Sequence, residues 1–289
     1  IKSVKNTKKI TKTMEMVAAS KMKRSQDRVV QARPYTTKLL EMMADLSSDI
    51  SPELVAKFPL LERREPAKRT LVFLLTADRG LCGAYNANVI RRARLLLDEL
   101  QQEGKSVEFH IGGRKGLQFF RFRRYDIAGA HPNLPDRPSL ADADQFTEIF
   151  REAFLSGRVD EVKLVFSRFA SAVAQVPTVI DLLPLAAPQG GKPTAETSTS
   201  SKYLRNFVFE PSSEVILGRL FPLVLRNTVY NAMLNAVASE HSARRLAMKN
   251  ATDNAGDLIK SLTLSFNKAR QAQITQEIAE IGAGAAAVG

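Results

Sequence analysis

The loop at residues 76–86, with the sequence TADRGLCGAYN, is the segment whose composition and position come nearest to phosphate chemistry. It follows an apolar run at 71–76 and opens a helical pattern, which is where many α/β proteins bind phosphate groups. Gly80 and Gly83 give only a GxxG spacing, however, so neither the dinucleotide-binding pattern nor the P-loop pattern is complete. We interpret both glycines as residues that serve turn geometry.

The nucleophiles and metal ligands of the sequence are scattered. Cys82 is the only cysteine and has no CxxC partner, so a buried structural thiol is the better interpretation than a nucleophile. His110, His131 and His241 show neither metal-binding spacing nor the order of a catalytic triad. The segment GGRKG at 112–116 fits a strand-to-helix turn with solvated charges. We therefore expect no catalytic residue, no bound metal and no cofactor.

The chain carries an excess of positive charge, because 42 Lys and Arg against 30 Asp and Glu give a net charge of +12. This balance implies a partner rich in negative charge, such as nucleic acid, anionic lipid or acidic protein loops. Much of the excess lies near the start, at Lys2, Lys5, Lys8, Lys9, Lys12, Lys21, Lys23, Arg24 and Arg28. A solvated helix face, a nucleic-acid-binding stalk and a helix enclosed by acidic protein loops are the three interpretations. Few aromatic residues accompany these cations, which argues against the stalk because bases stack on aromatic side chains.

The sequence offers no candidate for a membrane span. No run of about 18 consecutive apolar residues occurs, and residues 1–13 lack the apolar core of a signal peptide. We therefore expect any contact with a membrane to be indirect. A single cysteine is typical of a reducing compartment.

Three segments of different composition must position these residues, and we predict domains at 1–55, 69–210 and 211–289. The composition of the first segment predicts a long helix, which Pro34 should kink or interrupt. The middle segment alternates apolar, β-branched runs with helical patterns, which predicts a Rossmann-like, mainly parallel α/β domain. Its expected strands are 71–76, 107–111, 163–169 and, at an edge of the sheet, 176–185.

The first and last segments both show a helical seam of seven-residue period. In the first, the seam is thin and consists mostly of small residues, Val4, Thr11, Ala18, Ser25 and Ala32. In the last, positions 234, 241, 248, 255, 262, 269 and 276 hold Leu, His, Met, Ala, Leu, Ala and Gln. Small residues permit close helix approach but bury little area. We predict that the two helices form an antiparallel coiled coil.

Helix length decides the predicted architecture. A helix of about 70 residues is roughly 105 Å long at 1.5 Å per residue. A compact globule of this chain length is only about 50 Å across. The last helix must therefore project from the α/β domain, and we predict a rod with a globular domain on its side.

Two segments give the chain a family resemblance. KITKTMEMVAASKMKRSQ at 9–26 and NATDNAGDLIKSLTLSFNKARQAQITQEIAEI at 250–281 closely resemble the two signature helices of the gamma subunit of F-type ATP synthases. The loop at 76–86 is similar to that family's first strand and loop of the middle domain. The resemblance implies a non-catalytic rotor shaft inside a ring of alternating alpha and beta subunits. A membrane ring of c subunits would turn it, and its rotation would drive ATP synthesis at the catalytic sites of beta.

The resemblance also implies roles for individual residues. Met14 matches the position that faces the acidic lever loop of beta. The other positions matched to contact with beta or to coupling are Lys21, Lys23, Arg24, Glu240, Arg244, Arg270, Gln271 and Thr275. Phe207 and Glu210 resemble the foot that sits on the c ring near the epsilon subunit, although tyrosine is common where Phe207 stands.

The wording MEMVAASKM at 14–22 is closer to bacterial members, which implies a peripheral protein on the cytoplasmic face of the inner membrane. The regulatory cysteine pair of the chloroplast type is absent, because Cys82 stands alone. We assign no role to the small, polar segment 186–202. Two other function classes stay open: a basic coiled-coil protein that binds nucleic acid, and a nucleotide-dependent enzyme in the α/β domain. The resemblance itself implies no nucleic-acid partner.

Overall fold

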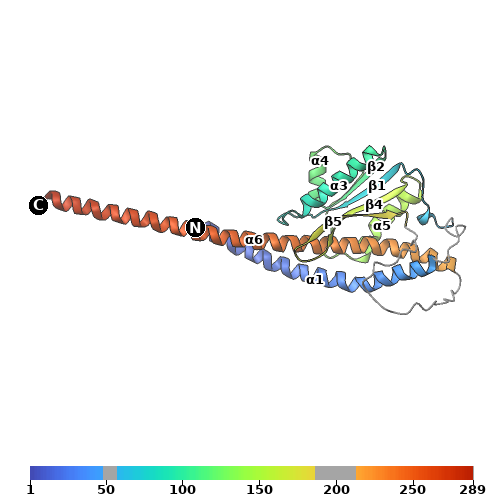
Figure 1. Ribbon diagram of the computed structural model, residues 1–289, viewed down its shortest axis with the longest axis horizontal. Helices are drawn as coiled ribbons and strands as arrows, with labels where there is room; N and C mark the ends of the chain where they lie inside the picture. The colour runs from blue at the N-terminus through green and yellow to red at the C-terminus, as the bar shows by residue number, and fades with distance from the viewer. Residues whose placement is uncertain (48–56, 186–212, 289) are drawn as a thin grey trace.

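The computed structural model describes residues 1–47, 57–185 and 213–288. Along the described chain, the order of helices and strands is α1 (Lys2–Ser47), the short 3-10 helix η1 (Pro59–Leu61), β1 (Arg69–Leu75), α3 (Tyr85–Gln102), β2 (Ser106–Gly112), α4 (Arg114–Phe122), β3 (Gly129–His131), α5 (Leu140–Leu155), β4 (Glu161–Phe169), β5 (Gln175–Leu183) and α6 (Ser213–Val288). Two long helices therefore flank an α/β segment in the sequence, and in space they lie side by side along one side of that domain (Figure 1).

The strands form one five-stranded sheet in the order β3-β2-β1-β4-β5. β1 pairs in parallel with β2 and β4, and β2 pairs in parallel with β3, whereas β5 runs antiparallel to β4. The predicted Rossmann-like, mainly parallel fold is confirmed, and the last strand lies at an edge as its prolines require. β1 is central and is buried from Thr70 to Leu75, because helices cover both faces of the sheet.

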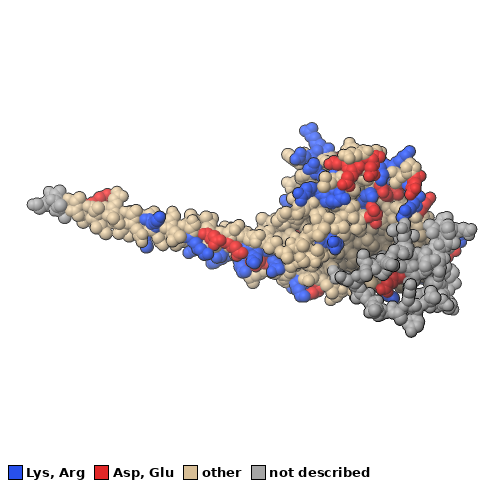
Figure 2. Space-filling view, in the orientation of Figure 1, with Lys and Arg blue, Asp and Glu red and all other residues tan. Residues whose placement is uncertain are grey.

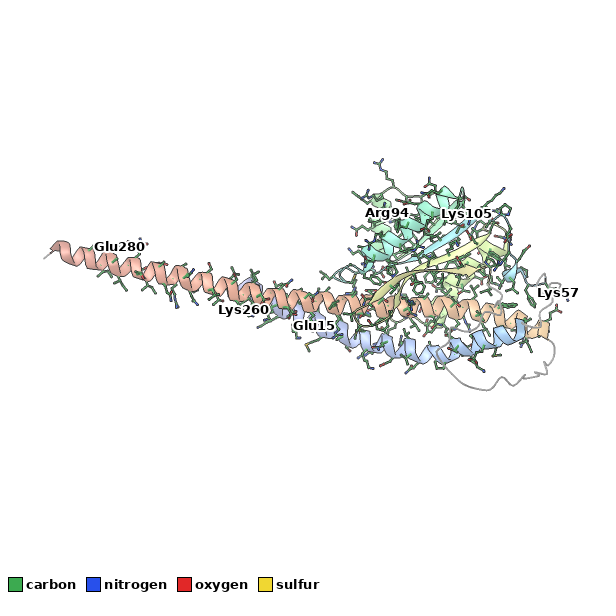
Figure 3. All side chains as sticks on the ribbon, in the orientation of Figure 1. Glu15, Lys57, Arg94, Lys105, Lys260 and Glu280 are labelled. Carbon is green, nitrogen blue, oxygen red and sulfur yellow. The ribbon has the colours of Figure 1, made fainter. Side chains whose placement is uncertain are left out.

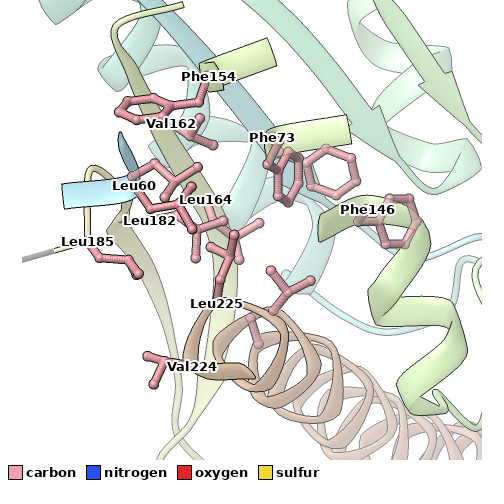
Figure 4. Packing of buried hydrophobic residues seen from close by; sticks show 14 of the residues in the cluster. Leu60, Phe73, Phe146, Phe154, Val162, Leu164, Leu182, Leu185, Val224 and Leu225 are labelled. Atoms are coloured by element: carbon pink, nitrogen blue, oxygen red, sulfur yellow. The ribbon is translucent and has the colours of Figure 1, made fainter. Parts of the chain in front are cut away.

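Alternate residues of β1 point into two hydrophobic cores. Val72 and Leu74 pack with apolar residues of α3 and α4 on one face. Leu71, Phe73 and Leu75 pack on the other face with apolar residues of α5 and of α6. Figure 4 shows this second core, in which Leu225 of α6 lies among side chains of the sheet and of α5. The C-terminal helix is therefore part of the domain core as well as a projecting rod.

Helices α1 and α6 lie side by side and antiparallel over the length of α1 (Figure 1). Thr36 accepts hydrogen bonds from the side-chain amides of Asn227 at 2.9 Å and Asn231 at 2.7 Å. Thr252 donates to Thr11 at 2.9 Å, so the pairing runs in opposite directions along the two helices. The predicted small-residue stripe of α1 forms the contact, and its central members Ala18 and Ser25 are buried. The antiparallel coiled coil is confirmed.

Helix α1 runs through Pro34 without interruption, so the predicted interruption is wrong, whereas the kink at Pro34 stays a prediction. Proline removes one backbone donor and crowds the preceding turn, at a cost of about 3 kcal/mol in a helix interior. Val29 and Leu39, one on each side of Pro34, are both only 6% exposed. Burial of such residues offsets the loss, and the helix continues.

Helix α6 extends far beyond the start of α1. Its 76 residues make a rod of roughly 114 Å at 1.5 Å per residue. The heptad seam is buried as far as Ala255 and becomes exposed after Leu262, where α1 no longer accompanies it. Figure 3 shows the contrast, because Glu15 lies on the part where the two helices are paired whereas Glu280 projects alone. Charged side chains become sparse toward this end (Figure 2).

Replacing Phe150 of α5 with Ala tests the second core. The ring is fully buried and lies 5.1 Å from the ring of Phe73, centroid to centroid. We expect a loss of about 3 to 5 kcal/mol in the free energy of unfolding, measured by urea denaturation, because the change leaves a cavity. Phe122→Ala is the matched control, since that ring is 83% exposed and its loss should matter by less than about 0.5 kcal/mol. Equal effects of the two variants would contradict the described packing.

Candidate functional site

A hollow between the paired helices and the α/β domain brings several of the expected residues together, and we call it the junction cavity. Its volume is about 550 Å³, and it is lined by α1, by the loop after β1, by the segment 133–138 and by α6. Met14 and Lys21 reach it from α1, and Glu240 and Arg244 reach it from α6. The cavity lies at the carboxyl end of β1, where the direction of the strand crossovers reverses and open α/β sheets bind their ligands.

An ion pair between Glu240 and Arg244 lies on the α6 side of this cavity. The distance from Arg244 Nη2 to Glu240 Oε1 is 2.6 Å, and their side chains are only 12% and 15% exposed. Arg244 also donates to the carbonyl oxygen of Gly80 at 3.4 Å, so it ties α6 to the loop after β1. Burial raises the pKa of Glu240 above its usual value, against the opposing effect of Arg244. The ion pair is thus partly desolvated. The guanidinium of Arg244 is held by Glu240, by the carbonyl oxygen of Gly80 and by a third group on α6.

His241 is the third partner of this guanidinium. Arg244 Nη1 lies 3.2 Å from His241 Nδ1, and because a guanidinium can only donate, Nδ1 must accept. Burial, followed by the charge of Arg244, lowers the pKa of His241 from 6.5 to about 4. The imidazole is therefore neutral at pH 7, with its proton on Nε2.

A second ion pair connects α1 to the α/β domain. Lys21 Nζ lies 2.5 Å from Asp136 Oδ2, and the two side chains are 38% and 55% exposed. The hydrogen bond from Lys21 is the chief cause that lowers the pKa of Asp136. Exposed pairs of this kind contribute about 0 to 1 kcal/mol, so the contact orients the segment 133–138 more than it stabilises the fold.

Polar side chains at the end of β1 and in the loop after it bind the start of α4 and the segment after β3. Asp78 Oδ1 accepts from the backbone nitrogens of Arg114 at 2.9 Å and Asn133 at 3.1 Å. Thr76 Oγ1 accepts from the backbone nitrogen of Gly116 at 2.9 Å, and a Cβ on Gly116 would approach that oxygen to 2.8 Å. The first turn of α4 is thus satisfied by the protein itself. Gly83 has a positive φ of 57°, which fits the interpretation of the incomplete GxxG pattern as turn geometry.

Comparison with known proteins decides the family. Residues 1–288 match the ATP synthase family. The chain is 46% identical over 288 residues to the ATP synthase gamma chain of Gemmatimonas aurantiaca, which covers 100% of this chain and 96% of that one. It is 43% identical over 285 residues to the ATP synthase gamma chain of Brevibacillus brevis, with 99% and 95% covered. The chain belongs to the ATP synthase gamma-chain family.

Solved structures agree with this assignment. The gamma-family chain superposes on a chain of the central stalk and c-ring structure of Tetrahymena thermophila mitochondrial ATP synthase with a TM-score of 0.61 and 26% identity, covering 84% of this chain and 99% of that one. A chain of the Euglena gracilis mitochondrial ATP synthase has the same fold, with a TM-score of 0.66 at 21% identity over 99% and 91% of the two chains. The chain is therefore a non-catalytic subunit of the central stalk, a rotor shaft, and the comparisons give no support to the nucleic-acid-binding alternative.

The remaining predicted residues of this gamma-family chain lie outside the junction cavity. Lys23 is exposed and pairs with Asp27 at 2.8 Å. Arg24 lines an adjoining hollow that shares Lys21 and Asp136 with the junction cavity. The last helix carries three exposed residues about 39 Å or more beyond Arg244, at 1.5 Å per residue, namely Arg270, Gln271 and Thr275. Phe207 and Glu210 lie outside the described residues.

Sequence reasoning missed the contribution of the segment 132–138 to the cavity. Asn133, Asp136 and Pro138 come from PNLPDRP, whose prolines indicate a loop and nothing more specific. Arg79 of the loop after β1 also lines the cavity and was not singled out. Within residues 1–47, 57–185 and 213–288, no three His, Cys, Asp or Glu side chains gather as a metal site would require. Nor does any described helix combine the length and apolarity of a bilayer span.

The neutral state of His241 predicts a pH dependence of stability. Its folded pKa of about 4 lies below the ordinary 6.5, so between these values the unfolded chain binds a proton that the folded chain does not. Stability should therefore fall as pH drops from 6.5 to 4, by up to about 3 kcal/mol from this residue. His241→Gln, which can still accept from Arg244, should show a flatter dependence in urea denaturation across this range. An identical slope in the variant and the parent would contradict a neutral, buried His241.

Proposed function

We propose that this chain couples rotation of a c-subunit ring to conformational change at the catalytic sites of the beta subunits of a proton-transporting F-type ATP synthase. The observation that carries this proposal is the unaccompanied part of α6. Beyond the start of α1 the helix continues alone for roughly 25 residues, or about 37 Å, away from the α/β domain (Figure 1). Most helical stability in proteins comes from packing of a helix face, so an exposed segment of this length favours an enclosing partner.

The surface of this projecting segment favours an enclosing protein. Leu264, Phe266, Ile278 and Ile281 are between 56% and 73% exposed, although each is a large apolar residue. At 100° per residue these four side chains fall within an arc of roughly 160°, so they form a broad apolar face that favours cover by protein. We infer that alternating alpha and beta subunits surround this segment.

Torque requires the shaft to present different faces to equivalent beta subunits. The shaft has two paired helices over part of its length and a single helix over the rest, so it is not symmetric about its long axis. Each orientation of the shaft therefore favours a different conformation of the beta subunit beside it. The driving energy arises from the difference in contact between orientations and not from tight binding in any one of them. Exposed, screened ion pairs of about 0 to 1 kcal/mol each suit a surface that must slide.

We propose that Met14 and the cations beside it face the acidic lever loop of beta. Met14 is half-buried at the rim of the junction cavity, and Lys21, Lys23 and Arg24 continue along the same helix. Glu240 and Arg244 lie across that cavity, and the more distant contacts with beta are assigned to Arg270, Gln271 and Thr275. The resemblance alone supports contact of Phe207 and Glu210 with the c ring and the epsilon subunit.

The membrane association of the synthase would be indirect for this chain. Its bacterial relatives support a peripheral position on the cytoplasmic face of the inner membrane, with no lipid contact of its own. The division into segments 1–55, 69–210 and 211–289 remains a prediction, in which the first and last segments form the shaft. We propose no nucleic-acid partner, and no cofactor is required.

The proposal is tested by affinity purification of the tagged chain at native expression level. Alpha, beta and epsilon subunits should be recovered with it in detergent-solubilised membranes, and the c subunit should follow. Recovery of nucleic acid in place of these subunits, lost steeply as salt rises, would contradict the proposal.

Met14→Lys is expected to loosen coupling. An added ammonium can form a charge-assisted hydrogen bond of about 1.5 to 3 kcal/mol with a carboxylate of the lever loop, but only in some orientations. Such a bond lowers the free energy of particular orientations of the rotor and so raises the free-energy barriers between them. Protons pumped per ATP hydrolysed in membrane vesicles should therefore fall.

Met14→Leu serves as the control for this variant, because it preserves size and lacks charge. It should leave the pumping ratio near that of the parent chain. If Lys and Leu lower the ratio equally, the electrostatic account of this contact is wrong.

A further inference from the structure

Two histidines, which we call the histidine pair, join β2 to β3 at one edge of the sheet. His110 Nδ1 lies 3.2 Å from His131 Nε2, and the two rings are nearly parallel, with 13° between their planes and 5.5 Å between their centroids. The His110 side chain is only 8% exposed. Its ring lies against the backbone of β3, because a Cβ at Gly129 would collide with it. β3 has three residues, so this contact supplements a short backbone ladder.

The protons of the histidine pair decide whether its hydrogen bond can form. Glu108 Oε1 lies 2.9 Å from His110 Nε2, and because a carboxylate only accepts, His110 Nε2 must donate to it. A neutral imidazole has one donor and one acceptor, whereas an imidazolium has two donors. The bond between the rings therefore requires that either His110 Nδ1 or His131 Nε2 carries no proton.

The pair can take up one proton and keep its bond, but it cannot take up two. With one added proton, one ring is cationic and the other still accepts. With two, N–H groups face each other across 3.2 Å and two cations lie 5.5 Å apart. The rings of Phe73 on β1 and Phe146 on α5 lie 5.6 and 5.5 Å from the ring of His131, centroid to centroid. Burial, followed by the neighbouring His110, lowers the pKa of His131.

The charged groups around the pair can offset one added proton and not two. Glu108 is a single carboxylate, and the Nε of Arg158, 3.0 Å from its Oε2, already shares it. On the segment after β3, Asp136 is bound by Lys21. A second proton on the pair is therefore resisted as long as β3 stays on the sheet.

β3 leads directly into the segment 132–138, which connects the α/β domain to α1. The carbonyl oxygen of His131 accepts from the backbone nitrogen of Gly113 at 3.0 Å. Two residues later the backbone nitrogen of Asn133 donates to a side chain of the loop after β1. Asp136 then binds Lys21 of α1. The position of β3 thus sets the position of a segment that contacts the shaft.

We propose that the histidine pair holds β3 on the sheet near neutral pH and releases it, together with the segment 132–138, when acid adds a second proton. The inference rests on the proposed function in one respect. Release would separate Asp136 from Lys21, one of the cations assigned to the acidic loop of beta. Acidification around the rotor would thereby change the surface that α1 presents to beta, while the core on α6 keeps the domain on the shaft.

The direction of the pH dependence follows from proton binding. In the released segment His131 has the ordinary histidine pKa of about 6.5, whereas on the sheet its pKa is lower. Below pH 6.5 the released form therefore binds a proton that the sheet-bound form does not. The opening equilibrium should rise as pH falls through this range, by up to about tenfold per pH unit for one proton.

The test is hydrogen–deuterium exchange of the full chain at pH 7.5 and pH 5.0, with rates corrected for the intrinsic pH dependence of amide exchange. Peptides that cover 128–138 report the opening, because the amides of Ala128 and Asn133 are hydrogen-bonded when β3 is in place. We expect their corrected exchange to rise about threefold to thirtyfold at pH 5.0. Peptides of α3 should exchange equally at both pH values.

His131→Gln should remove the response to acid. A glutamine amide can rotate to donate to His110 Nδ1 or to accept from it, so the contact survives whichever proton state His110 adopts. Exchange of 128–138 should then be nearly equal at the two pH values. His241→Gln is the matched control, because it removes the third histidine of the chain, which lies on α6 outside the pair, and it should respond as the parent does. A thermal midpoint at pH 7.5 near that of the parent establishes that each variant is folded.

An unchanged exchange of 128–138 in the parent at pH 5.0 would overturn the proposal, and this result does not depend on the folding of any variant. An equal increase in the peptides of α3 would also overturn it, because the whole domain would then open. So would a response that persists in His131→Gln, since another group would then be responsible. These measurements use the chain alone, so none of them bears on subunit recovery with the tagged chain, and the rotor role is tested separately.

Discussion

The structure depends on burying the middle of α6 on two sides at once. On one side Ser239, fully buried, donates to the carbonyl oxygen of Ser167 in β4 at 3.0 Å. On another side, roughly 80 to 120° around the helix, Asn227 and Asn231 donate to Thr36 of α1. The same helix thus completes the core of the α/β domain and forms half of the coiled coil. Small polar residues permit this double contact, because they satisfy backbone groups of the sheet while letting the helix approach closely.

This shared helix has a mechanical consequence for a rotor. The α/β domain cannot turn about the shaft without breaking the core of Leu217, Leu225 and the sheet, so both should rotate as one body. Contacts that must yield during rotation lie elsewhere, on exposed helix surface where ion pairs are weak. The buried pair of Glu240 and Arg244 belongs to the fixed part, since it ties α6 to the loop after β1. Helix α6 therefore has buried contacts that stay fixed to the α/β domain and an exposed surface that can slide past the surrounding subunits.

Much of this fold could be predicted from the sequence, because its main signals are local. The continuous apolar run of β1 indicated a strand covered on both faces, and the seven-residue stripe of α1 indicated a close helix partner. β3 has three residues and no strand pattern, and its position depends on pairing with β2, so it was missed. The junction cavity could not be predicted either. It forms where Met14, Asp136 and Glu240 meet, and no local pattern encodes contacts between residues so far apart in sequence.

The central claim is that this chain turns as a unit within the synthase, and direct observation of rotation tests it best. A fluorescent rod is attached to an engineered cysteine on the exposed face of α3, after replacement of Cys82, in a complex held to glass through its beta subunits. With ATP supplied, the account predicts rotation in one direction that stops when ATP is removed. ATP hydrolysis by the same labelled complexes with no net rotation of the rod would contradict it.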